Sequence, residues 1–219
     1  MAFLSRQALR RLGFAAIGAN VLVSDKASIH GASRIALGDH VRIDDFCVLS
    51  AGEGGIRIGS FVHVACQCTL IGKERIELDD FCNLSGRVAV YSSSDDFSGT
   101  GMTNPMVPLA LRRVTDAPVR IGRHAILGTG AVVLPGVTVG EGAAVGALTL
   151  VRKSLAPFTM YAGIPARRIG ARSRALLELE ARLRAERPDR SAAGRKLSRA
   201  GPPPATPPTS RRKRSPGRG

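Results

Sequence analysis

A strict six-residue period in the second half of the chain constrains its fold more than any other feature. Large aliphatic residues recur at every sixth position from Ile121 to Val151, and a mostly small residue lies four places after each of them. Neither an amphipathic helix nor an alternating strand repeats in this way. A parallel β-helix does, because each hexapeptide forms a short strand and a corner, with the aliphatic side chain pointing into the coil.

The first half of the chain obeys the same rule, and its hexapeptides are grouped in threes. Interruptions fall after every third hexapeptide, so that coils begin at residues 17, 37, 58, 78, 121 and 139. Three hexapeptides make one triangular coil, and all the extra residues fall at one corner. The sequence therefore predicts an all-β fold, a parallel β-helix of about six three-strand coils.

Both ends of such a stack need covering, because a terminal coil exposes strand edges and an apolar cross-section. Residues 5–12 are typical of a short helix with Ser5 as its N-cap, and the segment after residue 173 places Leu176, Leu179 and Leu183 on one helical face. We expect a capping helix in 1–16, the β-helix in 17–155 with an inserted loop at 92–118, a C-terminal segment and helix in 156–186, and a disordered tail in 187–219.

Much of the basic charge lies in the tail. The chain has 32 Lys and Arg against 17 Asp and Glu, and residues 186–219 hold ten of these basic residues against two acids. A Pro-rich, basic segment with few large apolar groups predicts a disordered solubilising tail, or else a tether for polyanions or a membrane surface. No apolar run has the length of about 18 residues that a membrane-spanning helix needs, so we expect a cytoplasmic protein.

The repeat explains the cysteines without a disulfide or a zinc site. Cys66 holds an outward third place, whereas the other three occupy the fifth place, where a thiol packs as a compact apolar group. The spacing is not the paired CxxC of a zinc site, and we expect no metal. The cysteines at the fifth place are Cys47, Cys68 and Cys82.

Two histidines belong to one predicted ring ladder. His40 and His124 occupy the fourth place of a coil's first hexapeptide, where the intervening coils carry Phe61 and Phe81. The four rings should stack along one face, as surface packing or as a subunit contact. The two histidines would then lie about 14 Å apart, at roughly 4.8 Å per coil, which is too far to share a metal ion.

His63 differs from the ladder histidines because it holds a sixth place, stacked between Arg42 and Asn83. An imidazole beside an amide that can orient it is a candidate general base. The alternative is an ordinary surface histidine. Asn83 is also a candidate for substrate binding.

The insert at residues 92–118 is the second place where chemistry is expected, because long irregular loops in a compact repeat are usually functional or disordered. Asp95 and Asp96 could supply a general base, or they could cap a turn, as Ser and Asp clusters often do. Ser94 and Asn104 are further candidates for binding the substrate. Apolar residues between Met106 and Leu111 could anchor the insert on a neighbouring surface.

These features together resemble a known family, the left-handed β-helix acyltransferases. Within it, the chain is most similar to the dTDP-4-amino-4,6-dideoxyglucose acyltransferases and related galactoside-type acetyltransferases. The resemblance covers about residues 3–185 and rests on the motifs IGANVLVSDKASIH, VRIDDFCVLS, FVHVACQ, YSSSDDFSGTGMTNPMVP, VVLPGVTVGEGAAVGALTLV and YAGIPARRI. It implies the left hand of the coil, a homotrimer with active sites between subunits, and acetyl-CoA as acyl donor.

The resemblance also implies roles for particular residues. Thr129 and Ala147 match small residues whose backbone meets the pantetheine arm, and Arg152, Lys153 and Arg167 match basic residues near the nucleotide phosphates. Many relatives carry a catalytic histidine in or just before the loop, but this chain has no histidine between residues 91 and 118. His63, Asp95 and Asp96 are therefore the catalytic candidates.

Three functions are compatible with these features of the sequence. The first is transfer of an acetyl group to the amino group of a nucleotide-linked sugar for surface polysaccharide, which is favoured because an amine needs less from a base than a hydroxyl does. The second is O-acetylation of a sugar. The third is a β-helix scaffold or binding module without catalysis, since fold alone does not fix function.

Overall fold

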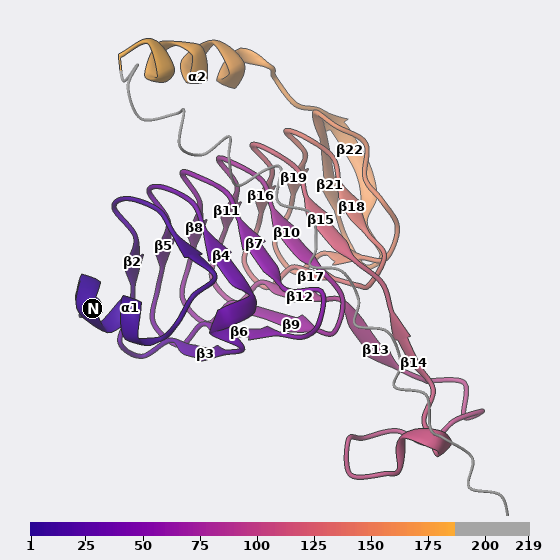
Figure 1. The fold of residues 1–219 in the computed structure, drawn as a ribbon. Coiled ribbons are helices and arrows are strands. Elements are labelled where there is room, and N and C mark those ends of the chain that lie inside the picture. Colours follow the sequence, from indigo (N-terminus) through magenta and orange to yellow (C-terminus); the bar gives the residue numbers. More distant parts are fainter. Residues whose placement is uncertain (187–219) are drawn as a thin grey trace, which may run out of the picture.

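Three parallel sheets wrap around one apolar axis in the computed structural model, which describes residues 1–186 (Figure 1). The first sheet contains, in spatial order, β1 (Ala16–Ile17), β4 (Ile35–Leu37), β7 (Ile56–Ile58), β10 (Ile76–Leu78), β15 (Val119–Ile121) and β18 (Thr138–Val139). The second contains β2 (Leu22–Val23), β5 (Arg42–Ile43), β8 (His63–Val64), β11 (Asn83–Leu84), β16 (Ile126–Leu127), β19 (Ala144–Val145), β21 (Thr159–Ala162) and β22 (Arg167–Ala171). The third contains β3 (Ser28–His30), β6 (Val48–Ala51), β9 (Thr69–Gly72), β12 (Ala89–Tyr91), β17 (Val132–Val133) and β20 (Leu150–Val151).

The register of these strands aligns the hexapeptides of successive coils. Leu37 pairs with Ile58, Ile58 with Leu78, and Leu78 with Ile121, so that first-place aliphatic residues form a continuous column. All four side chains are almost completely buried. Truncating one such residue to alanine costs about 2–5 kcal/mol, because the neighbouring coils cannot collapse into the space. The predicted fold is confirmed.

A partial seventh turn follows the six complete coils. The third side of the sixth coil is short, so Leu155 comes only four residues after Val151, yet Leu155 bridges to Val139 of the coil below. β21 then pairs in parallel with β19, and β22 turns back antiparallel on β21 to close the end of the stack.

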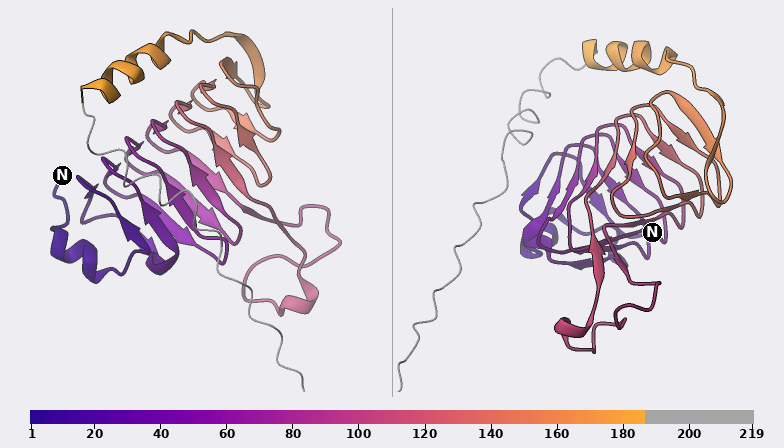
Figure 2. Two further views of the ribbon diagram at one scale, coloured as in Figure 1. Left: turned by 45° about the horizontal axis from the view of Figure 1, so that its top comes forward. Right: turned by 90° about the vertical axis from the view of Figure 1, so that its right-hand side faces the viewer.

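The opposite end of the stack is closed by α1 (Arg6–Arg11), whose Leu9 is buried against the first coil. Ser5 caps this helix as predicted, since the amide of Ala8 donates to its Oγ at 3.2 Å. Arg6 from the same helix donates to the carbonyl of Gly18 at 2.6 Å and ties α1 to the first coil. The stack is thus covered at both ends (Figure 2).

The predicted ring ladder is confirmed on the corner between the first and second sheets. His40 stacks on Phe61 with ring centroids 4.6 Å apart, Phe61 on Phe81 at 4.9 Å, and Phe81 on His124 at 4.9 Å. All four residues adopt positive φ angles between 56° and 61°. This left-handed conformation is costly for side chains of this size, and stacking at each step helps to compensate for it.

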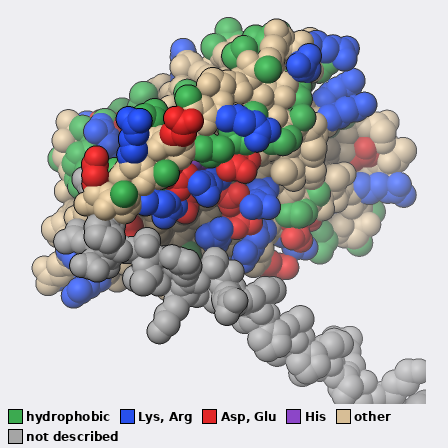
Figure 3. Space-filling model, turned by 90° about the horizontal axis from the view of Figure 1, so that it is seen from above, with side chains coloured by type: hydrophobic (Ala, Val, Ile, Leu, Met, Phe, Trp, Pro, Cys, Tyr) green, Lys and Arg blue, Asp and Glu red, His purple; other side chains and the backbone are tan. Residues whose placement is uncertain are grey.

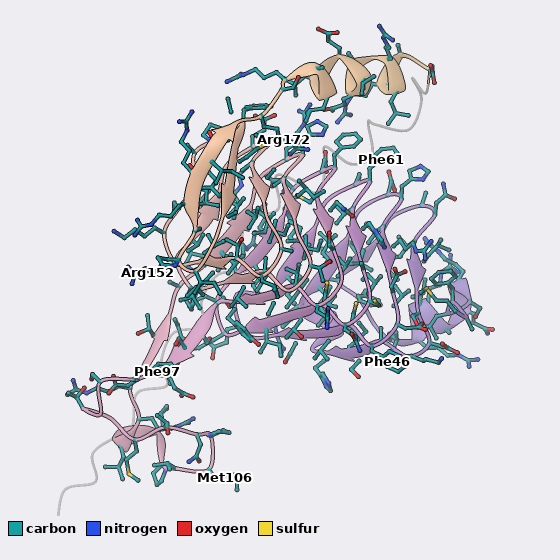
Figure 4. All side chains as sticks on the ribbon, turned by 180° about the vertical axis from the view of Figure 1, so that it is seen from behind. Phe46, Phe61, Phe97, Met106, Arg152 and Arg172 are labelled. Carbon is teal, nitrogen blue, oxygen red and sulfur yellow. The ribbon has the colours of Figure 1, made fainter. Side chains whose placement is uncertain are left out.

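The second helix, α2 (Ala175–Ala185), runs back over this ladder (Figures 1 and 4). The predicted leucine face is wrong in one respect, because Leu179 is 62% exposed and Glu180 is the buried residue of the helix. Glu180 accepts hydrogen bonds from Arg123 and His124 of the coils and from Arg184 of its own helix. The hydrogen bonds from these donors to the Glu180 carboxylate therefore determine which side of the helix faces the coils, rather than the burial of the leucine side chains. Figure 3 shows side chains of both charges intermingled on this side of the molecule.

The insertions gather at the corner between the third and first sheets, as the spacing predicts. There the chain forms a 3-10 turn at Ala32–Arg34 and wider loops after β6 and β9. After β12 it forms an antiparallel hairpin of β13 (Ser93–Asp95) and β14 (Val114–Asp116), with a 3-10 turn at Leu109–Leu111 in the intervening loop. This hairpin projects away from the coils (Figures 1 and 2).

The cysteines also lie where the repeat predicts. Cys47, Cys68 and Cys82 are buried and Cys66 is exposed, and all four thiols are free. None of the helices within residues 1–186 has the length and apolar composition needed to cross a lipid bilayer. The predicted disordered tail, residues 187–219, lies outside the described residues.

Candidate active site

The candidate site on the coils is built around His63 on the outer face of the second sheet. Register places His63 beside Arg42 on one strand and beside Asn83 on the other, as predicted. The Nδ1 atom of His63 lies 3.2 Å from Oδ1 of Asn83. Its Nε2 atom lies 2.9 Å from Oδ2 of Asp44, a residue that the sequence reasoning missed. Both ring nitrogens of His63 are therefore engaged.

Asp44 is an almost buried carboxylate whose two oxygens have different partners. Arg42 donates its Nε–H to Oδ1 at 2.7 Å, while His63 binds Oδ2. Burial by itself would raise the pKa of Asp44, but the hydrogen bonds and positive charge of Arg42 and His63 outweigh it and lower the pKa below its usual range. Asp44 is thus held as an anion. The available signal was a carboxylate at a second place of the repeat, which usually holds a small residue.

The two adjacent aspartates of the insert have different surroundings. Asp96 accepts hydrogen bonds from the amide and hydroxyl of Ser98, the hydroxyl of Thr100 and the amide of Gly101, so both of its oxygens are occupied. These bonds lower the pKa of Asp96 and favour the turn role for it. Asp95, at the end of β13, is exposed, and its carboxylate accepts no hydrogen bond from the described residues.

The other two candidates of the insert also lie in the hairpin. Ser94 pairs with Thr115 across the two strands, and its hydroxyl is 3.3 Å from the carbonyl oxygen of Asp95. Asn104 holds a turn, because its Oδ1 accepts from the amide of Met106 at 3.0 Å and its φ is +71°. The hairpin that carries these residues projects away from the coils (Figure 1), and none of the hydrogen bonds among the described residues joins them to His63.

The tip of the hairpin carries unusually exposed apolar side chains. Phe97 is 94% exposed, Met106 90% and Leu109 74%. Figure 4 shows Phe97 and Met106 well separated from the coils. Such a group of exposed apolar side chains is typical of an interaction surface.

The candidates for binding an acyl donor lie toward the C-terminal end of the stack. Thr129 and Ala147 occupy the same corner in successive coils, and the amide of Leu148 donates to the carbonyl of Thr129 at 2.8 Å. A Cβ atom on Gly128 would lie 2.6 Å from the backbone nitrogen of Ala147. The backbone of successive coils is therefore closely stacked at Thr129 and Ala147, where an extended ligand arm can approach it, and Leu148 beside them is an exposed apolar side chain.

The basic candidates lie at two places near the last coil, after β20 and at the start of β22, where Arg167 pairs with Ala162. Arg152 and Lys153 follow β20 and are exposed, and Arg167 is exposed at the start of β22. The amide of Ala166 donates to the carbonyl of Leu150 at 2.9 Å, so the segment before Arg167 lies beside the strand before Arg152. Their charges suit phosphate groups. Within residues 1–186 no three His, Cys, Asp or Glu side chains are grouped as metal ligands.

No family model matches the chain. A dTDP-4-amino-4,6-dideoxy-D-glucose acyltransferase from Escherichia coli is 48% identical over 180 residues, which cover 82% of this chain and 94% of the relative. The chain belongs to the dTDP-4-amino-4,6-dideoxy-D-glucose acyltransferase family. It is an acyltransferase with the left-handed β-helix fold of that group.

Solved structures agree with this family assignment. AntD, an N-acyltransferase from Bacillus cereus in complex with dTDP and 3-hydroxybutyryl-CoA, is 42% identical, with a TM-score of 0.81 over 84% of this acyltransferase and 97% of AntD. A variant of AntD in which a serine is replaced by alanine, in complex with dTDP-4-amino-4,6-dideoxyglucose and Coenzyme A, gives a TM-score of 0.82 at 41% identity. The match covers 84% of this acyltransferase and 98% of the AntD variant.

A more distant relative has a different named activity. A lipopolysaccharide biosynthesis O-acetyl transferase from Escherichia coli strain K12 is 27% identical over 152 residues, which cover 66% of this chain and 72% of that relative. The sequence identity of this acyltransferase to proteins that act on or bind amino sugar nucleotides is thus much higher than its identity to this O-acetyl transferase.

Proposed function

We propose that this acyltransferase moves an acetyl group from acetyl-CoA to the amino group of a dTDP-linked 4-amino-4,6-dideoxy sugar used for surface polysaccharide. The observation that carries the proposal is the similarity over nearly the whole length of two relatives, 94% of the Escherichia coli enzyme and 97% of AntD. AntD binds dTDP together with an acyl-CoA, and its serine variant binds the amino sugar nucleotide together with CoA. Both substrates are cytoplasmic metabolites, and we place the enzyme in the cytoplasm.

The donor would lie along the C-terminal coils. Its pantetheine arm would pass the closely stacked backbone at Thr129 and Ala147, with the exposed apolar side chain of Leu148 beside it. Its phosphates would meet Arg152, Lys153 and Arg167, whose exposed charges suit charge-assisted hydrogen bonds. The acyl-CoA is a substrate here rather than a resident cofactor.

The reaction is direct transfer within a ternary complex. The neutral amine attacks the carbonyl carbon of the thioester and loses a proton to a base, and the C–S bond breaks to release CoA as a thiolate, which takes up a proton. Positioning supplies much of the rate, and backbone N–H groups stabilise the oxyanion. Asp95 is the favoured base, because the carboxylate of Asp96 is used in its turn and both ring nitrogens of His63 are engaged.

The active site would be completed by a second subunit in a homotrimer. The exposed Phe97, Met106 and Leu109 of the hairpin support this, because a neighbouring subunit could cover them. The hairpin would then carry Asp95 to the outer sheet face of that neighbour. Sedimentation should give three times the chain mass, and replacing Phe97 and Met106 with serine should lower it. A monomeric wild type with full activity would contradict this arrangement.

Mass spectrometry of the reaction products tests the proposed function. The protein is incubated with acetyl-CoA and a panel of dTDP-linked 4-amino sugars, other nucleotide amino sugars and simple galactosides. A gain of one acetyl group on the dTDP-linked amino sugar is expected. Acetylation of the galactosides alone would make the enzyme an O-acetyltransferase. Acetyl-CoA binding without any product would point to a different acceptor, and no binding would favour a scaffold.

A further inference from the structure

Asp44, His63 and Asn83 form a hydrogen-bonded chain across three successive coils. The His63 ring lies 2.9 Å from the Asp44 carboxylate through Nε2 and 3.2 Å from the Asn83 amide oxygen through Nδ1. This series of hydrogen bonds leads from the protein interior toward solvent, since the Asp44 side chain is 9% exposed and that of His63 is 41% exposed. A buried anion therefore controls the orientation of a ring at the surface.

The contacts of the His63 ring determine how the Asn83 amide is held. A carboxylate only accepts hydrogen bonds, so His63 donates its Nε2–H to Asp44. Nδ1 faces the amide oxygen of Asn83, which accepts the hydrogen bond of this contact. The amide N–H₂ group is then turned away from the ring and is the end available to a ligand.

We propose that Asp44 is a positioning residue, which acts through His63 to hold the Asn83 amide toward the acceptor sugar with its N–H₂ group outward as a hydrogen-bond donor. Asp44 itself touches no substrate and moves no proton. The inference rests on the proposed function, because it takes the sugar nucleotide as the ligand that Asn83 meets.

The surroundings of Asp44 fit this role. Arg42 binds the other carboxylate oxygen at 2.7 Å, which fixes the carboxylate in place and leaves Oδ2 directed at His63. Among the described residues, Arg42 is the charged side chain that contacts the series Asp44, His63 and Asn83. If Asp44 served only to pair with Arg42, its contact with His63 would have no purpose.

Asp79 supplies a matched control. It also holds a second place of the repeat, its side chain is 11% exposed, and it pairs with Arg120 at 2.8 Å and Arg57 at 3.6 Å. Its burial is similar to that of Asp44 and its partners are also arginines, but within residues 1–186 its ion pairs include no histidine or asparagine. A merely structural carboxylate should behave like Asp79.

Steady-state kinetics with dTDP-4-amino-4,6-dideoxyglucose and acetyl-CoA test the inference. Asp44→Asn should raise the KM for the amino sugar about tenfold and leave the KM for acetyl-CoA unchanged, and Asn83→Ala should do the same. The double variant should be no worse than Asn83→Ala, because both changes break one chain. Asp79→Asn should leave both KM values unchanged. If Asp44→Asn does not fold, His63→Gln provides the same test.

Two results would overturn the inference. One is an Asp44→Asn variant, or His63→Gln in its place, with the acceptor KM of the wild type. The other is a double variant whose loss equals the product of the two single losses. Wild-type protein that acetylates no dTDP-linked amino sugar would instead contradict the proposed function, and this inference with it.

Discussion

The contact of Glu180 with the coils provides a prediction about how α2 is held. Its side chain is 2% exposed, and it accepts from Arg123 and Arg184, which are 40% and 44% exposed, and from His124, which is 9% exposed. Burial would raise the pKa of Glu180, but the hydrogen bonds from Arg184, His124 and Arg123 lower it below the usual range. The carboxylate is therefore charged and is the polar anchor of the helix.

Replacing Glu180 with Gln should loosen α2 without unfolding the coils. Hydrogen bonds to a charged group contribute about 1.5–3 kcal/mol, and exposed arginines regain part of this from water. We expect a net loss of roughly 1.5 kcal/mol, which is about a tenfold change in an equilibrium constant. The amides in the second half of α2 should then exchange with deuterium about tenfold faster, whereas those of β10 and β15 should be unchanged.

Glu178 is the matched control for this experiment. It lies on the same helix, is exposed, and forms no ion pair with the described residues. Glu178→Gln should leave the exchange rates of α2 as they are in the wild type. Equal exchange in the Glu178→Gln and Glu180→Gln proteins would refute the idea that the buried carboxylate holds the helix.

Three further predictions concern the base, the coil spacing and acid. Asp95→Asn should lower kcat at least a hundredfold in the acetylation assay, whereas Asp96→Asn should mainly lower the melting temperature; the reverse would exchange their roles. Gly122→Ala should lower the melting temperature, because a Cβ there lies 2.7 Å from backbone nitrogen of the next coil, whereas Gly86→Ala meets nothing closer than 3.4 Å; equal effects would contradict this. Because the folded pKa of Asp44 is lowered, its stabilisation should disappear as pH falls through that value, so wild-type melting temperatures should drop in acid more than those of Asp44→Asn.

The coil architecture could be predicted from the sequence because the same local rule repeats in every coil. Once the first-place positions such as Leu78 and Ile121 are known, parallel stacking fixes every neighbour one coil away. The ring ladder, the burial of Cys82 and the position of His63 between two known residues all follow from this. None of them needs information about contacts outside the repeat.

The parts that the repeat does not govern could not be predicted in the same way. The side of α2 that faces the coils depends on where the helix packs. Arg123 and His124 at that place bind Glu180, whereas Leu179 stays exposed. The Asp44 contact could not be predicted from the repeat, because the repeat rule expects only glycine or a small polar residue at the second place. The roles of Asp95 and Asp96 depend on turn hydrogen bonds that adjacent identical residues do not reveal.

The restriction of extra residues to one corner makes this molecule a candidate framework for grafting. At the other two corners, the first-place residues of a coil are always six positions apart. This constant spacing maintains the strand register between coils, for example the pairing of Ile58 with Leu78, although the loops at the variable corner differ in length. A foreign peptide placed within the loop at residues 52–55 would lengthen a segment whose length already varies from coil to coil. The same peptide placed beside Phe46 would interrupt a corner where successive coils are joined by backbone hydrogen bonds, such as the one from the amide of Gln67 to the carbonyl of Asp45. The protein can therefore display added sequence at regular intervals along one edge without a change in its core.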